Sequence, residues 1–174
     1  QVSWYDSIAF CRWLTAKAQE RPNLLPAELD RNHPWKVTLP TEWQWEKAAR
    51  GHDGRRYPWG GIFLRSEYAN IKETTSGLGP RSPLNTTVVG MYPHGVSPYG
   101  VADLCGNVEE WCLNEYDNPK KTDPNGDAKR VARGGSWYDF IWNGAAPCRD
   151  GDVPYRRDPF HGFRVVVVGW RPKA

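Results

Sequence analysis

The sequence lacks several features that would place it in a common class of protein. Its four cysteines form no CxxC pair and its four histidines form no HExxH motif, which argues against a zinc site. No apolar run exceeds four residues, so no membrane-spanning segment is predicted. It has no dense run of Lys or Arg, and a net charge of +3 over 174 residues does not predict nucleic-acid binding. Unpaired cysteines and the lack of a visible signal peptide favour a cytoplasmic protein with reduced thiols.

Two segments carry the signals of amphipathic helices. The first covers residues 2–18, where Ser3 and Asp6 have the spacing of a capping box. The second is expected to begin after Thr41, with Gln44 as the partner of that cap. Because caps and apolar periodicity agree in both segments, we expect two helices in the N-terminal third of the chain.

The remainder of the chain has little regular periodicity. Between residues 51 and 133, short apolar pieces alternate with Gly, Pro, Asn and Asp, a pattern typical of loops. The last apolar stretch, residues 163–168, predicts a strand that is buried on both faces. Two helices, long loops and a few short strands indicate an α+β domain.

Residues 138–161 combine large aromatic and charged residues without a helical or strand period. The turn Gly134-Gly135-Ser136-Trp137 precedes them and Gly162-Phe163 follows them. Tyr, Trp, Phe and Arg dominate the energetics of protein interfaces, so this composition indicates a contact surface. The alternative, strongest for Ile141 and Trp142, is that the apolar side chains fold back into the core.

Five segments in one order resemble the formylglycine-generating-enzyme/sulfatase-modifying-factor family: "VSWYDSIAFCRW", "LPTEWQWEKAARG", "YPWG", "YGVADLCGNVEEW" and "RVARGGSW…GFRVV". The resemblance covers nearly the whole chain. It implies a C-type-lectin fold, in which two helices flank a small twisted antiparallel sheet with long irregular loops. We therefore expect a single domain over residues 1–174. Members of this family usually carry several strands before the "VSW" segment, so the domain is expected to lack its N-terminal strands.

The resemblance also bears on catalysis. The family's oxidase binds copper through a pair of cysteines shortly after the Gly-Gly-Ser turn, and an alignment without gaps places Asp139 and Gly144 there. Neither residue supplies the thiolate that Cu(I) requires. The family's iron-dependent sulfoxide synthases take their histidine ligands from another domain. The expectation is therefore a protein that is not an enzyme and requires no cofactor.

The segment "CGNVEEW" resembles a calcium site of the family. The resemblance implies that the carbonyl groups of Cys105, Gly106 and Val108 and the carboxylate of Glu110 bind the ion, which is suitable chemistry for a hard cation. The alternative is that Glu110 belongs to a buried polar network.

The stretch from Gly134 to Arg164 is also similar to the C-terminal cassette of the variable proteins of diversity-generating retroelements, which share this fold. In that cassette a framework alternates with positions where almost any residue is installed. The resemblance implies a ligand-binding surface whose positions are diversified by a retroelement. Its residues are Tyr138, Asp139, Phe140, Asn143, Asp150, Asp152, Tyr155, Arg156, Asp158, Phe160 and His161.

The expected partner is a protein or another macromolecule. The alternative function is an accessory or regulatory domain of a larger enzyme or signalling protein, in which the same side chains pack against a sister domain.

Overall fold

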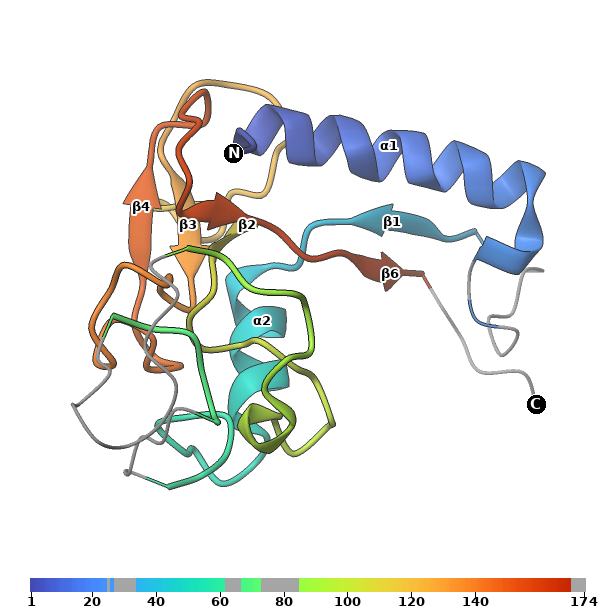
Figure 1. Cartoon of the computed structure of the whole chain (residues 1–174). Helices are drawn as coiled ribbons and strands as arrows, with labels where there is room; N and C mark the ends of the chain where they lie inside the picture. The colour runs from blue at the N-terminus through green and yellow to red at the C-terminus, as the bar shows by residue number, and fades with distance from the viewer. Residues whose placement is uncertain (25, 27–33, 62–66, 73–84, 170–174) are drawn as a thin grey trace.

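The computed structural model describes residues 1–24, 26, 34–61, 67–72 and 85–169. Two α-helices, α1 (Trp4–Glu20) and α2 (Glu42–Arg50), accompany two small sheets, as expected for an α+β protein. Figure 1 shows α1 lying along one side of the strands β1 (Lys36–Thr38) and β6 (Val166–Val168), while α2 lies below these strands, near the centre of the view. Within the described residues, no helix is both long and apolar enough to cross a bilayer.

Both predicted helices begin at the expected caps. The Ser3 hydroxyl accepts a hydrogen bond from the Asp6 backbone N–H, and the Asp6 carboxylate accepts one from the Ser3 N–H. The Thr41 hydroxyl and the Gln44 side chain make the same reciprocal pair at the start of α2. Both helix predictions are confirmed. Caps of this kind can be predicted from sequence because each capping side chain satisfies a backbone group only a few residues away.

The strands form two sheets. Strands β1 (Lys36–Thr38) and β6 (Val166–Val168) pair as an antiparallel ribbon. The larger sheet has the order β4-β3-β2-β5 and is made of β4 (Asp150–Asp152), β3 (Arg130–Arg133), β2 (Glu109–Glu115) and β5 (His161–Gly162). Its strands pair antiparallel except for β2 and β5, which are parallel. Two 3₁₀ turns, at Pro22–Leu24 and Pro93–Gly95, complete the regular elements of the described chain.

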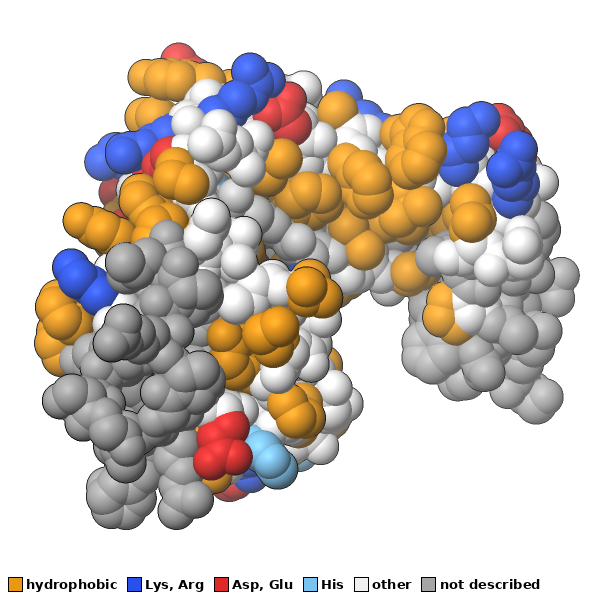
Figure 2. Space-filling model, viewed as in Figure 1, with side chains coloured by type: hydrophobic (Ala, Val, Ile, Leu, Met, Phe, Trp, Pro, Cys, Tyr) orange, Lys and Arg blue, Asp and Glu red, His pale blue; other side chains and the backbone are white. Residues whose placement is uncertain are grey.

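The final strand differs from its prediction. Only Val166–Val168 are extended in the ladder, and all three are partly exposed. Val165, just before them, is 38% exposed. The apolar run is therefore not buried on both faces, and within the described residues β6 pairs only with β1. Figure 2 shows hydrophobic side chains gathered on the surface where α1 meets this ribbon.

The core is divided among three clusters. The first joins α1 to β1, β2 and β3 through Trp4, Ile8, Cys11, Val37, Leu39, Trp111 and Ala132. The second joins α2 to β2 and β3 through Trp45, Ala49, Leu104, Cys112, Val131 and Ala146. The third lies under the loops and contains Tyr57, Ala69, Ile71, Cys105 and Ala145. Strand β3, which is buried along its whole length, thus has a helix on either side, and it leads directly into residues 134–161.

Replacing Thr41 with alanine is expected to lower the free energy of unfolding by about 1 kcal/mol, because the first turn of α2 loses its side-chain acceptor. Urea melts of the wild type and the variant measure this loss. Thr41→Ser keeps the hydroxyl and serves as the control, with a smaller change expected. A Thr41→Ala variant as stable as the wild type would show that this capping box does not stabilise α2.

Candidate binding surface

Residues 134–161 begin at a turn that only glycine fits easily. Gly134 and Gly135 have φ angles of 94° and 63°, in the region that favours glycine. A Cβ on Gly135 would lie 2.9 Å from the backbone nitrogen of Gly144, and one on Gly134 would lie 3.0 Å from the Trp45 ring. The turn is also tied to the segment just before β2 by hydrogen bonds from Gly106 N–H to the Gly134 carbonyl and from Trp137 N–H to the Asn107 carbonyl. The loop is therefore attached to a rigid base.

A group of aromatic rings projects from this base, and we refer to Tyr138, Phe140, Trp142 and Phe160 as the aromatic face. Tyr138 is 52% exposed, Phe140 40% and Trp142 50%, while Phe160 is partly exposed. The Phe140 and Trp142 rings stack with centroids 4.6 Å apart, and those of Tyr138 and Phe160 lie 5.1 Å apart. Lys72 places its ammonium group 4.6 Å from the Tyr138 ring centroid and 5.0 Å from that of Phe140. The rings thus form two pairs, and the Lys72 ammonium group contacts one ring of each pair.

Two members of this arrangement were not expected from the sequence. Trp142 was a candidate for the core, yet half of it is exposed. Lys72 lies far away in the chain, and no local pattern marks it as a neighbour of the aromatic residues. Its backbone N–H donates to the Asp139 carbonyl at 2.9 Å, which brings it to the loop. Tyr155 is 68% exposed but makes no ring contact with the aromatic face among the described residues.

A polar recess is lined by residues of β2, β3 and β4 and of the loop between β3 and β4. Its volume is about 310 Å³. It is lined by Glu109, Ala132, Arg133, Gly134, Gly135, Asn143, Cys148, Arg149 and Asp150. Burial, followed by the nearby Asp150 charge among other groups, raises the pKa of Glu109 even though His161 opposes the shift. The predicted residues Asn143 and Asp150 belong to this recess, whereas Tyr138, Phe140 and Phe160 belong to the aromatic face.

The charged residues of the second half of the loop form a separate group. Arg156 contacts Asp152 at 3.1 Å and Asp158 at 2.8 Å. His161 differs from its expected place on the surface, since its side chain is only 4% exposed and its ring stacks on Trp111 with centroids 4.3 Å apart. Its burial follows from its position in β5, where it pairs with Glu109 of β2. His161 is therefore inside the surface layer and not available for direct contact.

Two carboxylates near the loop serve structural roles. Asp139 accepts hydrogen bonds from the Ser136 hydroxyl and N–H, which closes the turn. Asp6 of α1 accepts two hydrogen bonds from the exposed Arg157 guanidinium, each 2.8 Å long. The Arg157 side chain, followed by Ser3, lowers the pKa of Asp6 below its usual range. These contacts attach the loop to its own turn and to the start of α1.

The expected calcium residues lie together at the start of β2. The Gly106 carbonyl accepts a hydrogen bond from Val108 N–H at 3.0 Å. The Glu110 carboxylate is buried and accepts hydrogen bonds from Trp45 Nε1 at 2.6 Å and from Arg164 at 2.5 and 2.7 Å. Burial lowers the pKa of Arg164, but the Glu110 charge raises it by more, so the pKa of Arg164 lies above its usual value. The Glu110 side chain thus belongs to a buried ion pair, and calcium binding by these residues stays a prediction.

Three of the four thiols are buried in a way that keeps them protonated. Cys105 and Cys112 are buried, and burial raises the pKa of each thiol far above its usual range. Burial also raises the pKa of Cys11 to about 11. Thiolates are the form that binds soft metals or attacks substrates, so these three cysteines are suited to packing. At the position of the second copper ligand, a Cβ on Gly144 would lie 2.6 Å from the Cys105 sulfur.

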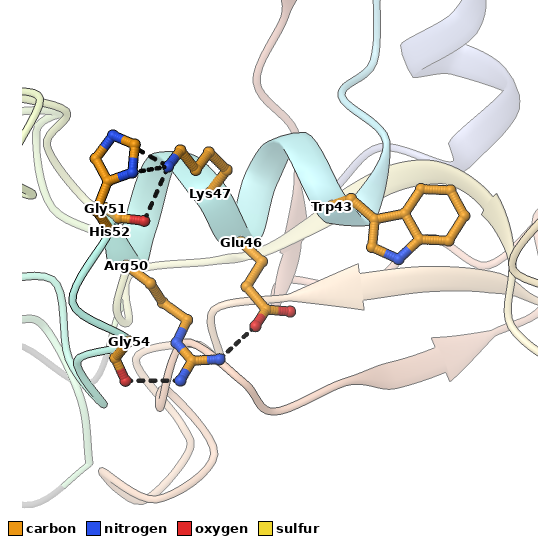
Figure 3. A pocket seen from close by; sticks show the side chains of 7 residues that line it. All are labelled: Trp43, Glu46, Lys47, Arg50, Gly51, His52 and Gly54. Carbon is orange, nitrogen blue, oxygen red and sulfur yellow. Dashed lines mark hydrogen bonds and ion pairs between the residues drawn. The ribbon is translucent and has the colours of Figure 1, made fainter.

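Another pocket, of about 360 Å³, lies on the outer side of α2. Figure 3 shows that its charged side chains point toward one another, with Glu46 paired to Arg50 and Lys47 placed beside His52. The second oxygen of Glu46 accepts from Arg133 of β3 at 2.5 Å. Burial raises the pKa of Glu46, but Arg50 and Arg133 lower it by more. Because Glu46 bonds both Arg50 and Arg133, the charged side chains of this pocket link α2 to β3.

The comparisons with known proteins agree with this fold. Residues 1–168 match the family model of the sulfatase-modifying factor enzyme 1-like domain. The inactive C-alpha-formylglycine-generating enzyme 2 of Mus musculus is 31% identical over 185 residues, which cover 99% of this chain and 49% of that protein. The solved structure of Treponema denticola variable protein 1 superposes with a TM-score of 0.70 at 26% identity, covering 97% of this chain and 69% of that one. The chain thus spans about half the length of the curated relative.

One relative corrects an expectation. Hercynine oxygenase of Mycobacterium tuberculosis, by its name an enzyme, is 30% identical over 180 residues, which cover 95% of this chain and 35% of that protein. The expectation that this chain is not an enzyme is therefore wrong, because the missing cysteine pair bears only on copper chemistry and enzymes share the same domain. Active, inactive and variable proteins all share this fold, and the chain belongs to the family of the sulfatase-modifying factor enzyme 1-like domain.

Proposed function

We propose that this domain is a binding module whose contact surface lies at residues 138–161. The observation that carries the proposal is the aromatic face, since three of its four rings are at least 40% exposed on a loop that is anchored to β3 and to the segment just before β2. Large apolar side chains that are exposed together on one loop normally mark an interaction site. Rings that already contact one another in the free protein also lose little conformational entropy on binding, which favours affinity.

The composition of the surface supports a protein partner. Large aromatic side chains supply most of the binding energy in protein interfaces, and polar neighbours exclude water around them. Here Asn143, which directly follows Trp142 of the aromatic face in the chain, lines the polar recess together with Asp150. Lys72 adds a positive charge above the rings, so an acidic or carbonyl-rich patch on the partner would complement it.

The proposal is tested by finding a partner and locating its footprint. The wild-type chain is screened against an array of proteins from its source organism, and the complex is then probed by hydroxyl-radical footprinting. We expect protection of Tyr138, Phe140 and Trp142. The hydrophobic residues Val88, Val89 and Met91, which are at least 55% exposed outside the surface, serve as the internal control and are expected to stay reactive. Protection of the control residues alone would refute the proposal.

The likeness to a variable protein supports a further element of this proposal, namely that the exposed positions of residues 138–161 are diversified. A diversifying retroelement would leave a near-copy of the corresponding DNA close to the gene, with adenines at the variable codons, and a reverse transcriptase gene beside it. Sequencing the flanking DNA tests this. A locus with neither feature would show that the surface has a fixed sequence, in which case a single dedicated partner is expected.

The alternative is that the surface packs against another domain of a longer protein. The observation that favours it is the length of the relatives, of which this chain covers 49% and 35%. Footprinting separates the two, since a sister domain would protect the aromatic face in the longer protein without any added partner.

A further inference from the structure

Three potential metal ligands converge where β4 and β5 are joined by residues 153–160. They are the carboxylates of Asp152 and Asp158 and the imidazole of His161, and one ligand atom of each lies within 4.8 Å of the others. The Nδ1 atom of His161 faces Asp158 Oδ1 at 3.0 Å. Asp152 stands at the end of β4 and His161 at the start of β5, so two of the three come from regular elements.

The histidine of this cluster is buried between two carboxylates, with Asp158 beside Nδ1 and Glu109 beside Nε2. Its side chain is 4% exposed, and neither ring nitrogen makes a hydrogen bond of normal geometry among the described residues. A buried imidazole without hydrogen bonds is costly unless another group satisfies it. Trp111 stacks on the ring face at 4.3 Å and fixes its plane, with Nδ1 directed toward Asp158.

The far side of the ring has the arrangement that metal-binding histidines usually show. Glu109 Oε2 lies 3.3 Å from Nε2, opposite the nitrogen that faces Asp158. Histidine ligands commonly direct their second ring nitrogen to a carboxylate, which orients the ring and strengthens the nitrogen as a ligand. Glu109 is itself held in β2, next to His161 in the parallel ladder.

Arg156 now occupies the place of a cation between the two aspartates. Its guanidinium contacts Asp152 Oδ2 at 3.1 Å and Asp158 Oδ2 at 2.8 Å, and its side chain is 54% exposed. An exposed arginine can swing into solvent with a small loss of stability. Tetrahedral zinc ligands lie roughly 3.3 Å apart, so the most distant of the three ligand atoms would approach one another by up to about 1.5 Å around an ion.

We propose that Asp152, Asp158 and His161 form a binding site for a first-row divalent cation such as Zn²⁺, with Arg156 as a displaceable cation that occupies it. One imidazole nitrogen and two carboxylates suit such an ion better than calcium, which prefers oxygen ligands alone. The site is separate from the residues 105–110 expected to bind calcium. It does not depend on the proposed contact surface, since an ion here would stiffen residues 153–160 whether or not a partner binds.

Isothermal titration of the metal-free chain with Zn²⁺ tests the site. We expect one ion per chain, with binding weakened at least about 10-fold by Asp158→Asn and by Glu109→Gln. Removing the competing cation with Arg156→Ala is expected to tighten binding by about 3- to 30-fold, as for the loss of two exposed ion pairs. Asp127→Asn, which changes an exposed aspartate outside the cluster, is the matched control and is expected to have no effect.

Three outcomes would overturn the proposal. The first is the absence of Zn²⁺ binding by both the wild type and Arg156→Ala, which retains all three ligands. The second is binding that Asp158→Asn leaves unchanged while circular dichroism shows the variant folded. The third is a thiolate charge-transfer band in the spectrum of the Co²⁺-loaded chain, which would place the ion on a cysteine.

Discussion

Replacing Trp45 with alanine is expected to lower the free energy of unfolding by about 3–5 kcal/mol. The side chain is 1% exposed and fills the core between α2, β2 and β3. The substitution removes that volume and also the indole N–H that donates to Glu110 at 2.6 Å. A buried carboxylate that loses a donor adds its own cost, because Arg164 then remains its principal partner. Chemical denaturation followed by fluorescence and circular dichroism measures the loss.

Trp43 provides a matched control for this experiment. It lies two residues earlier in α2 and is 53% exposed, at the edge of the pocket shown in Figure 3. Trp43→Ala is therefore expected to change the free energy of unfolding by no more than about 0.5 kcal/mol. Equal losses for the two variants would contradict the assignment of Trp45 to the core and of Trp43 to the outer face of α2.

The second large effect is expected on binding. Replacing Tyr138, Phe140, Tyr155 and Phe160 together with serine is expected to weaken the affinity for the partner at least about 100-fold, since a few aromatic anchors usually carry most of the binding energy. The melting temperature is expected to fall by no more than about 4 °C, because none of the four rings is buried. Surface plasmon resonance and thermal melts measure the two quantities on the same preparation.

A variant of the same kind outside the surface gives the comparison. Val88→Ser, Val89→Ser and Met91→Ser remove exposed apolar side chains between residues 85 and 95 and are expected to leave the affinity unchanged. If this control lost affinity while the serine variant of the four aromatic residues kept it, the contact surface would lie at residues 88–91 instead. A large fall in melting temperature for the serine variant would instead show that the four rings belong to the core.

The sequence predicted the features of this fold that depend on neighbouring residues. Both capping boxes were visible because Ser3 with Asp6, and Thr41 with Gln44, satisfy backbone groups of the same turn. Strands β4 and β5 were not visible, since they are only three and two residues long and are defined by partners distant in the sequence. An apolar run likewise could not show that β6 would have a single neighbour among the described residues.

The candidate surface was predictable in composition but not in arrangement. The exposure of Tyr138 and Phe140 agrees with the irregular pattern around them. The burial of His161 does not, because a polar residue in a loop-like stretch gives no sign that it will stack on Trp111. The contact of Lys72 with the rings depends on a backbone hydrogen bond to Asp139 between distant segments, which a single sequence cannot reveal.

The central claim, that residues 138–161 are a contact surface on a rigid base, is tested most directly by the affinity and melting temperature of the serine variant of Tyr138, Phe140, Tyr155 and Phe160. The account predicts a folded protein that melts within about 4 °C of the wild type and has lost at least about 100-fold in affinity. A variant that melts normally and binds as tightly as the wild type would contradict it.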